Sequence, residues 1–288
     1  MFVVTGATGN TGRVVAERLL DAGKPVRVVV RDRAKAAALA ARGAEIRVAD
    51  LQDEAAITET LRGAEGAYLL SPPDPTSSDF IGQRKGLSER LARAAQRAEV
   101  KHVVLLSSIG AQHAAGTGPI VTAHNAETQL RATGLPTTFV RAAYFVENFE
   151  STLPVAQRDG VLPSFAPLEQ RIPMVATRDI GAAAAQALLE GPRGQRIIDL
   201  SSAIEASTSE VAQTLSRILG RAVQPVLVPL AAIEPTLTSF GVSPQFAALM
   251  REMYGAIARG ELFGWDDQGE RVRGPTDLES ALRALVQR

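Results

Sequence analysis

The stretch "FVVTGATGNTGRVVAERLL" occupies residues 2–20 and decides the fold of the chain. Its first four residues, apolar or β-branched, are typical of a buried strand, and its second half has the apolar periodicity of a helix. Between them stand Gly6, Gly9 and Gly12, spaced three residues apart. A strand, a glycine-rich turn and a helix in this order form the context that a dinucleotide-binding fingerprint requires.

Each glycine of this turn has a separate expected role. Gly6 permits a tight turn, Gly9 lets the backbone approach a pyrophosphate, and Gly12 allows the helix to pack closely on the strand. The helix that begins near Thr11 is expected to direct its free N–H groups and the positive end of its dipole at the phosphates. The alternative, a turn with incidental glycines, does not account for the strand–helix units that follow.

Strand-like and helix-like runs alternate through the first half of the chain. The strand-like runs are continuously apolar and rich in Val and Leu, as strands buried on both faces must be. They cover residues 2–5, 26–31, 45–49, 66–71, 102–108 and 137–141, and the helix-like runs lie near 11–22, 33–42, 54–62, 79–98 and 121–133. This alternation predicts an α/β fold with a doubly wound, Rossmann-like parallel sheet.

After about residue 142 the rhythm loosens, and we expect a second lobe. Prolines and glycines are frequent in residues 153–173, which predicts a loop there. This loop is expected to be a mobile flap. Residues 1–142 are expected to form the dinucleotide-binding domain, with 177–202 returning to its sheet. Residues 143–176 and 203–288 are expected to form a smaller, mainly helical C-terminal lobe that binds the substrate.

The bulk composition excludes several classes of protein. The 288 residues include 31 basic and 31 acidic side chains, so neither nucleic acid nor a membrane surface is an expected partner. No segment reaches about 18 uncharged apolar residues, the length that spans a bilayer. The chain has no cysteine, and its three histidines share no metal-ligand spacing, so no metal site is expected. A soluble, cytoplasmic protein fits this composition.

The end of the second strand is expected to set the choice of coenzyme. A carboxylate there would accept from both ribose hydroxyls of NAD, whereas an arginine would favour the 2′-phosphate of NADP. Arg31 stands at this position, followed by Asp32, Arg33 and Lys35. This order predicts NADP(H) as the cofactor, and the alternative is a solvated turn into the next helix.

Polar residues also end the third and fifth strands. Asp50 is expected either to accept the adenine amino group or to cap the helix that begins near Asp53. Ser107 and Ser108 end the fifth strand at the carboxyl edge of the sheet, where ligands bind. They are expected either to hydrogen-bond the coenzyme or substrate, or only to terminate a buried strand.

Six segments together resemble a known family. They are "TGATGNTG" (5–12), "VVVRD" (28–32), "VADLQD" (48–53), "LLSSIGA" (105–111), "RAAYFVENF" (141–149) and "FGVSPQFAALMREMYGAIARGE" (240–261). The chain resembles the NmrA-like family of atypical short-chain dehydrogenase/reductases, and within it the quinone oxidoreductase and triphenylmethane reductase branch. Members of this family are either NADP(H)-dependent reductases of quinones and dyes, or redox sensors that bind the dinucleotide without turnover.

The resemblance implies site residues, position by position. It assigns the pyrophosphate to Thr8, Gly9, Asn10 and Thr11, and the 2′-phosphate to Arg31. It places Ser71, Pro72 and Pro73 beside the riboses, and it places Tyr144, Phe145 and Asn148 beside the nicotinamide and the substrate.

The tyrosine and lysine that short-chain dehydrogenases carry four residues apart on the fifth helix are missing. Ile120 and His124 occupy that spacing in "PIVTAHNAETQL" (119–130). Reduction of simple ketones is therefore not expected, because their alkoxide product needs a positioned acid. A quinone or a cationic dye gives a stabilised product, so orientation of donor and acceptor can supply most of the acceleration.

His124 and Tyr144 are the candidate catalytic residues. A neutral His124 is expected to donate to a ribose hydroxyl and a protonated one to relay a proton, with Glu127 orienting the ring. The alternative is a surface histidine paired with a glutamate. Tyr144 is expected to line the substrate pocket or, as the alternative, to donate a proton.

The sequence leaves two functions open. The first is an NADPH-dependent oxidoreductase that delivers hydride to a small, quinone-like or conjugated electron-poor acceptor. The second is a non-catalytic NADP(H)-binding sensor that regulates another protein. Phe263 and Trp265 stand in a polar stretch and are expected to serve as a lid or as the contact of a homodimer.

Overall fold

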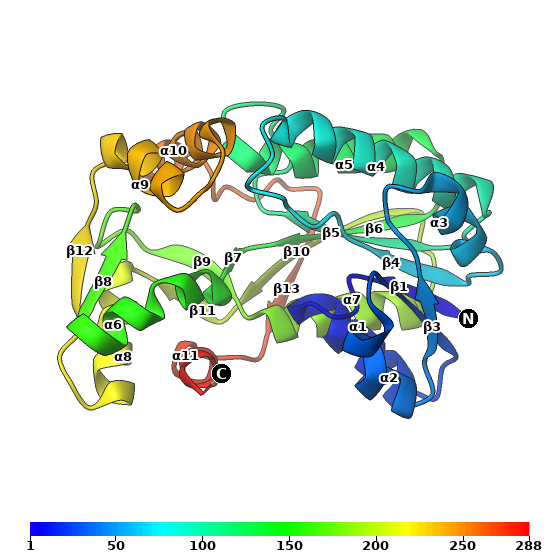
Figure 1. Ribbon diagram of the computed structural model, residues 1–288, viewed down its shortest axis with the longest axis horizontal. Helices are drawn as coiled ribbons and strands as arrows, with labels where there is room; N and C mark the ends of the chain where they lie inside the picture. The colour runs from blue at the N-terminus through cyan, green and yellow to red at the C-terminus, as the bar shows by residue number, and fades with distance from the viewer. Residues whose placement is uncertain (288) are drawn as a thin grey trace.

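The computed structural model describes residues 1–287 and is built on one eight-stranded sheet, in which every pairing is parallel (Figure 1). Its strands are β1 (Phe2–Thr5), β2 (Val26–Val30), β3 (Glu45–Val48), β4 (Gly66–Leu69), β5 (Val103–Ser108), β6 (Thr137–Ala142), β10 (Gln195–Ser202) and β13 (Glu270–Gly274). Their spatial order is β13-β10-β6-β5-β4-β1-β2-β3. The topological switch point, where α/β sheets bind ligands, therefore lies between β1 and β4.

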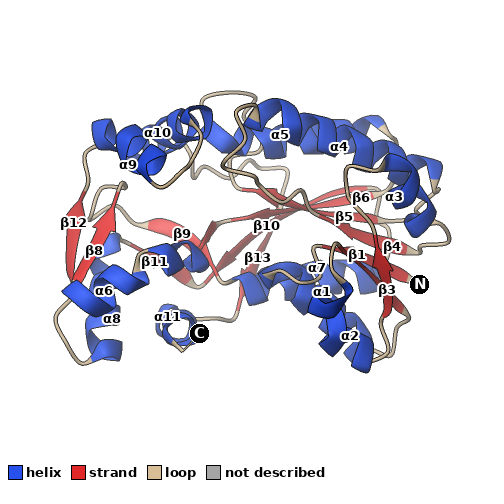
Figure 2. Ribbon diagram, viewed as in Figure 1, coloured by secondary structure: helices blue, strands red, loops and turns tan. Residues whose placement is uncertain are grey.

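Helices cover both faces of this sheet (Figure 2). One face carries α1 (Asn10–Asp21), α2 (Ala37–Ala41) and α7 (Thr177–Glu190), and the other carries α3 (Glu54–Leu61), α4 (Phe80–Arg97) and α5 (Val121–Ala132). Successive side chains of a strand point to opposite faces. Val4 accordingly packs in the core beneath α1 and α7, while Val3 packs in the core beneath α3 and α4.

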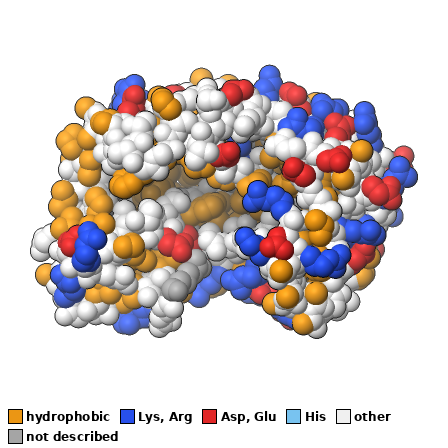
Figure 3. Space-filling view, in the orientation of Figure 1, with side chains coloured by type: hydrophobic (Ala, Val, Ile, Leu, Met, Phe, Trp, Pro, Cys, Tyr) orange, Lys and Arg blue, Asp and Glu red, His pale blue; other side chains and the backbone are white. Residues whose placement is uncertain are grey.

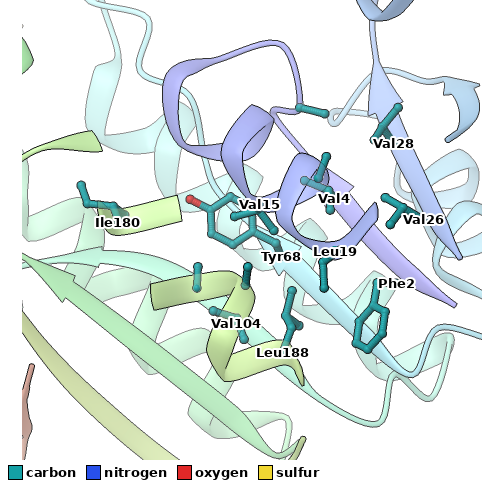
Figure 4. Packing of buried hydrophobic residues seen from close by; sticks show 14 of the residues in the cluster. Phe2, Val4, Val15, Leu19, Val26, Val28, Tyr68, Val104, Ile180 and Leu188 are labelled. Atoms are coloured by element: carbon teal, nitrogen blue, oxygen red, sulfur yellow. The ribbon is translucent and has the colours of Figure 1, made fainter. Parts of the chain in front are cut away.

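The core beneath α1 and α7 is shown in Figure 4. Phe2 and Val4 on β1 pack there with Leu19 on α1 and Leu188 on α7, and the ring of Tyr68 on β4 fills the space between them. All five side chains are at least nine-tenths buried. Burial of each such side chain stabilises the fold by about 1.5–3 kcal/mol, which is why α1 is held firmly against the sheet.

The predicted α/β fold is confirmed. The predicted strands of the first half of the chain are all present, and four of the five helices between them start and end within two residues of the expected positions. The exception is α2, which starts at Ala37 because residues 33–36 form a separate 3-10 turn. The returning segment is also found, because α7 packs on the sheet and β10 pairs with β6. The pattern could predict these elements because each depends on local periodicity and on a turn next to it in the chain.

The second lobe combines two small sheets with helices and has its own apolar core around Leu162, Met174, Leu215 and Leu282. The first sheet contains β7 (Tyr144–Phe145), β9 (Ile172–Val175) and β11 (Ile204–Ala206), and the second contains β8 (Val161–Ser164) and β12 (Gln224–Leu227). The helices are α6 (Leu153–Asp159), α8 (Thr208–Leu219), α9 (Ile233–Ser239), α10 (Pro244–Ala258) and α11 (Leu278–Val286). Short helical turns are η1 (Arg33–Ala36), η2 (Gly118–Ile120), η3 (Val146–Ser151) and η4 (Leu230–Ala232).

The prediction of a loop over residues 153–173 is wrong, because this segment contains α6 and β8. Pro154 lies in the first turn of α6, where proline lacks no hydrogen bond that the helix needs. Gly160 ends the helix in the left-handed region at φ +68°. The proline and glycine that suggested a loop thus occupy the two positions at which a helix favours them.

A second correction concerns the division of the chain. Residues 203–288 were expected to belong entirely to the lobe, but β13 pairs with β10 and extends the large sheet. Its sequence "ERVRG" is mostly polar, so it lacks the apolar pattern of a buried strand. Within residues 1–287, every helix falls short of the length or apolar character that crossing a bilayer requires.

Candidate coenzyme and acceptor site

The glycine turn follows β1 at the switch point of the sheet. Gly6 adopts φ +62°, and the N–H of Gly9 donates to the Gly6 carbonyl oxygen at 2.9 Å. A Cβ atom on Gly12 would collide with the Gly6 carbonyl oxygen and lie 2.9 Å from the Thr5 carbonyl oxygen. Glycine at these positions is what allows α1 to begin so close to the strand.

The first turn of α1 is open to a ligand. Its N-cap residue is Gly9, and within residues 1–287 no side chain caps the helix. The first N–H groups of a helix have no partner within it, and they attract anions. Thr8, Gly9 and Asn10 are exposed around this terminus. These features fit a pyrophosphate, although the contact of each residue with the coenzyme stays a prediction.

Thr11 is held by a residue that sequence reasoning missed. The Tyr68 hydroxyl donates to Thr11 Oγ1 at 2.9 Å, and both side chains are buried. Burial raises the pKa of Tyr68, so the phenol stays protonated and donates. The Thr11 side chain therefore points to β4. Because its oxygen accepts this bond, its own O–H and its backbone N–H both remain as donors for a ligand. The sequence could not predict this contact, because a tyrosine in an apolar strand fits the pattern of a buried strand like any other apolar residue.

Arg31 is exposed just beyond β2 and forms no hydrogen bond or ion pair within residues 1–287. Asp32 faces elsewhere, because its carboxylate accepts from the Ala34 N–H at 2.9 Å and caps η1. Arg33 donates to the Ile46 carbonyl oxygen at 3.1 Å. The Asp32 side chain thus caps η1, and the Arg33 side chain is hydrogen-bonded to β3. Arg31 therefore remains available for a phosphate.

Asp50 forms a local turn at the end of β3. Its Oδ1 accepts from the Gln52 N–H at 2.9 Å, and its side chain is exposed. The residue that caps α3 is Asp53, whose carboxylate accepts from the Ala56 N–H. The alternative in which Asp50 caps this helix is therefore wrong. Recognition of adenine by Asp50 stays a prediction.

The loop after β4 connects the sheet to the lobe. Ser71 Oγ is buried without a hydrogen-bond partner in residues 1–287, which suits a ligand hydroxyl, and Pro72 beside it is exposed. Further along this loop, the Pro75 carbonyl oxygen accepts from the Ser243 N–H at the start of α10 at 2.9 Å. A ligand at Ser71 would therefore contact a loop that is hydrogen-bonded to the start of α10 in the lobe.

His124 on α5 is oriented by the backbone and not by Glu127. Its Nδ1 lies 2.9 Å from the Ala111 carbonyl oxygen, in the loop after β5. A carbonyl oxygen only accepts, so Nδ1 carries the proton and Nε2 of the neutral ring is an acceptor. The expectation that a neutral His124 donates to a ribose hydroxyl is therefore corrected: it would accept from one.

Glu127 belongs to a buried ion pair with Arg141 at the end of β6. Arg141 Nε and Nη2 donate to the two Glu127 carboxylate oxygens at 2.9 and 2.8 Å, and Nη1 donates to Asp266 at 2.7 Å. Burial alone would lower the pKa of the Arg141 guanidinium, but the two carboxylates raise it. The Ser107 hydroxyl donates to the same Glu127 carboxylate at 2.6 Å, so toward a ligand Ser107 can only accept.

Tyr144 lies at the edge of the lobe, where its hydroxyl oxygen is 3.5 Å from the Tyr254 hydroxyl oxygen on α10. Phe145 packs on the core of the large sheet, whereas Tyr144 packs on the core of the lobe. The structure thus directs these neighbours to different sides and does not bring Phe145 to the Tyr144 phenol. Asn148 is exposed on η3, and Ser108 donates to the Ile109 carbonyl oxygen.

The glutamate of the "YFVENF" segment is structural. Glu147 accepts from the Thr177 N–H at 3.0 Å and from the Thr177 hydroxyl at 2.6 Å. It thereby satisfies the first turn of α7 from outside the helix. This cap fixes the chain three residues after Tyr144, and so the segment holds Tyr144 in position.

The loops that carry most of these residues end at the same edge of the large sheet. The carboxyl ends of parallel strands share one edge, so the loops after β1, β2, β4, β5 and β6 lie together. Figure 3 shows the surface deeply hollowed between the large sheet and the lobe, with hydrophobic side chains visible inside. A dinucleotide along the edge of the sheet would therefore place its reactive end toward the lobe.

Comparison with known proteins agrees with this geometry. A model of the NmrA-like family matches residues 1–273, nearly the whole chain. The chain belongs to the NmrA-like family. The resemblance predicted from the sequence is confirmed. One relative of this NmrA-like protein is the NAD(P)H azoreductase of Xenophilus azovorans, which is 30% identical over 278 residues that cover 95% of this chain and 93% of the relative.

Two solved structures share the fold of this NmrA-like protein over its whole length. NADPH-dependent quinone oxidoreductase QOR2 from Escherichia coli, complexed with NADPH, has a TM-score of 0.82 and 28% identity, covering 99% of this chain and 100% of that one. Triphenylmethane reductase from Citrobacter sp., complexed with NADP(H), has a TM-score of 0.82 and 26% identity, with the same coverage. These relatives belong to the branch that the sequence predicted.

The NmrA-like protein also carries a buried carboxyl group that makes its stability depend on pH. Asp199 on β10 lies in register with Arg141 on β6 and Arg271 on β13, and its carboxylate oxygens have no hydrogen-bond partner within residues 1–287. Burial, with the nearby Asp266 charge, raises the pKa of Asp199 to about 6. The folded state holds the Asp199 proton more tightly than the unfolded chain does. The protonated carboxyl therefore stabilises the folded state at low pH, and this stabilisation is lost as the pH rises through about 6.

We therefore expect Asp199→Asn to be more stable than the wild type at pH 7.5, by about 1–2 kcal/mol. The difference should shrink as the pH falls toward about 5, because the wild-type carboxyl is then neutral as well. Urea unfolding of both proteins at several pH values measures this difference. A difference that stays constant from pH 5 to 8 would contradict the assignment.

Proposed function

We propose that this protein is an NADPH-dependent reductase that delivers hydride to a conjugated, electron-poor acceptor such as a quinone. The observation that carries the proposal is an open, glycine-built helix terminus after β1, with an arginine after the adjacent β2 that has no ion-pair partner among residues 1–287, in a chain without the tyrosine–lysine pair of ketone reductases. The names of its relatives, an azoreductase, a quinone oxidoreductase and a triphenylmethane reductase, support the reductase and the coenzyme.

The residues at the edge of the sheet would bind and orient the coenzyme, which supplies the hydride when bound. The turn from Thr8 to Gly12 would hold the pyrophosphate through those of its N–H groups that have no carbonyl partner, and Arg31 would hold the 2′-phosphate. Asp50 would accept from the adenine amino group, and Ser71, Pro72, Ser107 and His124 would contact the riboses and the nicotinamide. In this proposal, residues 1–142 and 177–202 carry the coenzyme, and most of the remaining chain carries the acceptor.

The acceptor would lie between the nicotinamide and the lobe, beside Ser108, Tyr144 and Asn148. Positioning two reactants in one site can remove about 7–11 kcal/mol from a bimolecular barrier. An acceptor that yields a stabilised product needs little more than this positioning. A simple ketone needs an acid at its oxygen, and Ile120 and His124 occupy the positions where that tyrosine and lysine would stand.

The test is to mix the purified protein and NADPH with quinones, azo compounds, cationic dyes, enones and simple ketones, and to follow nicotinamide absorbance. We expect steady oxidation with at least one quinone or dye and none with simple ketones. Tight NADPH binding without consumption across the whole panel would instead identify a sensor. Failure to bind either nicotinamide coenzyme would contradict both functions.

The assignment of Arg31 predicts a change of coenzyme preference. Arg31→Asp should weaken NADPH binding by about 100-fold, because a charge-assisted contact is replaced by repulsion, and should leave NADH binding nearly unchanged. Lys35→Asp is the matched control, since it makes the same change of charge at an exposed position close by. Titration calorimetry with both coenzymes measures the effect. Equal losses of NADPH and NADH, or equal effects of the two variants, would refute the phosphate contact.

A further inference from the structure

Two phenols from distant parts of the chain meet at the edge of the lobe. Tyr144 Oη and Tyr254 Oη are 3.5 Å apart, and both side chains keep part of their surface exposed. Phe149 packs edge-on against Tyr144 with 6.0 Å between ring centroids, and Phe165 lies 5.4 Å from Tyr254. Because each ring is held by another ring, the two hydroxyls have a defined separation.

Both phenols keep their protons at neutral pH. Burial raises the pKa of Tyr144 well above its usual range and the nearby Tyr254 raises it further, although a hydrogen bond with the Asn148 side chain acts in the opposite direction. Burial also raises the pKa of Tyr254. Within residues 1–287, no lysine, arginine or histidine hydrogen-bonds to either hydroxyl, unlike the phenol of a tyrosine–lysine pair. The pair is therefore suited to donate hydrogen bonds rather than to surrender a proton outright.

We propose that Tyr254 is a positioning residue whose hydroxyl donates to Tyr144 Oη and turns the Tyr144 O–H toward an oxygen of the acceptor. This inference rests on the proposed reductase function and narrows it to acceptors that become anionic on reduction. The separation of 3.5 Å is long for such a bond, and bonds of this kind commonly shorten when the substrate binds.

The charge that develops on the acceptor decides which reactions the pair assists. A quinone that takes a hydride from the coenzyme gains two electrons and one hydrogen and becomes a hydroquinone monoanion, which then takes a proton from water. A hydrogen bond to the oxygen that becomes negative stabilises the transition state more than the ground state. The bond from Tyr254 polarises the Tyr144 O–H and strengthens that effect. A cationic triphenylmethane dye becomes neutral on taking hydride, so no oxyanion forms.

The experiment compares Tyr144→Phe, Tyr254→Phe and the double variant, each of which keeps the rings and removes only hydroxyls. The measured quantity is kcat/KM at saturating NADPH for a benzoquinone and for a cationic triphenylmethane dye. With the quinone, we expect losses of about 100-fold for Tyr144→Phe and about tenfold for Tyr254→Phe. With the dye, both variants should stay within about twofold of the wild type, because no oxyanion needs the donor.

The double variant tests whether the hydroxyls act in series. If Tyr254 acts through Tyr144, the double variant should lose about as much quinone activity as Tyr144→Phe alone. Multiplied losses would overturn the inference, as would equal losses on quinone and dye, or a Tyr254→Phe variant with wild-type quinone activity. The NADPH dissociation constant of each variant should equal that of the wild type, which excludes a general disturbance of the site.

The inference about Tyr254 can be wrong while the proposed reductase function is right. A wild type that reduces both acceptors, with variants that do not distinguish them, would leave the reductase standing and remove the role of Tyr254. A wild type that reduces the dye alone would also overturn the inference. If the wild type reduces the quinone alone, the double variant still decides. A wild type that binds NADPH and reduces neither acceptor would overturn the proposed function, and the inference with it.

Discussion

Gly12→Ala is expected to destabilise the protein by about 3 kcal/mol or more and to abolish coenzyme binding. The added Cβ would collide with the Gly6 carbonyl oxygen and lie 2.7 Å from its carbonyl carbon and 2.9 Å from the Thr5 carbonyl oxygen. All three neighbours are backbone atoms, so no side chain can move aside. The helix would have to leave the strand, and the buried contacts of Val15 and Leu19 on α1 would be lost with it.

Gly9→Ala is the matched control for this prediction. Its Cβ would meet only the Gly6 carbonyl oxygen, at 3.4 Å, and its φ of −93° suits alanine. We expect this variant to unfold in urea like the wild type but to bind NADPH at least about 30-fold more weakly, because the methyl group would occupy the path of the pyrophosphate. Urea unfolding and titration calorimetry on both variants separate stability from binding.

Two outcomes would contradict these expectations. Wild-type stability of Gly12→Ala would show that α1 does not need its close approach to β1. Wild-type NADPH affinity of Gly9→Ala would remove the pyrophosphate from this turn, whatever the stability of the variant. The two glycines thus test the fold and the ligand separately, although they belong to one motif.

The sequence predicts this part of the molecule well because the signals are local. A buried parallel strand and the helix after it differ in period, and the glycines mark the turn between them. The edge strand β13 gives no such signal, since only its pairing with β10, far away in the chain, makes "ERVRG" a strand. The same holds for the two residues of β7, which become a strand by pairing with β9.

The site shows the same division between local and distant contacts. Spacing on α5 suggested that Glu127 orients His124, since residues three apart share a helix face. The structure gives Glu127 to Arg141, because a guanidinium from the neighbouring strand meets both carboxylate oxygens. The Tyr144–Tyr254 pair was equally hidden, because no periodicity on α10 shows which residue faces β7. Residue spacing thus identified the candidates, and tertiary packing selected their partners.

Arg141→Met is the second change with a large expected effect. It would leave the buried Glu127 carboxylate without its two shortest guanidinium contacts, and it would leave Asp266 with the Gln268 N–H but without its guanidinium partner. Removing one member of a buried ion pair typically costs about 3–5 kcal/mol, because a charge remains in the interior without compensation. We therefore expect a loss of that size in the free energy of unfolding, measured in urea at pH 7.5.

Two further variants separate the buried charge from lost packing. Arg131→Met removes a half-exposed guanidinium that also reaches Glu127, at 3.3 Å, and should cost only about 1 kcal/mol. Combining Arg141→Met with Glu127→Gln removes the stranded charge and keeps an acceptor for the Ser107 hydroxyl, so it should recover more than half of the loss. If the combined variant is no more stable than Arg141→Met, the cost lies in the packing of the arginine stem. The ion pair at the end of β6 would then contribute little to the free energy of unfolding. The orientation of the Ser107 hydroxyl would need another explanation.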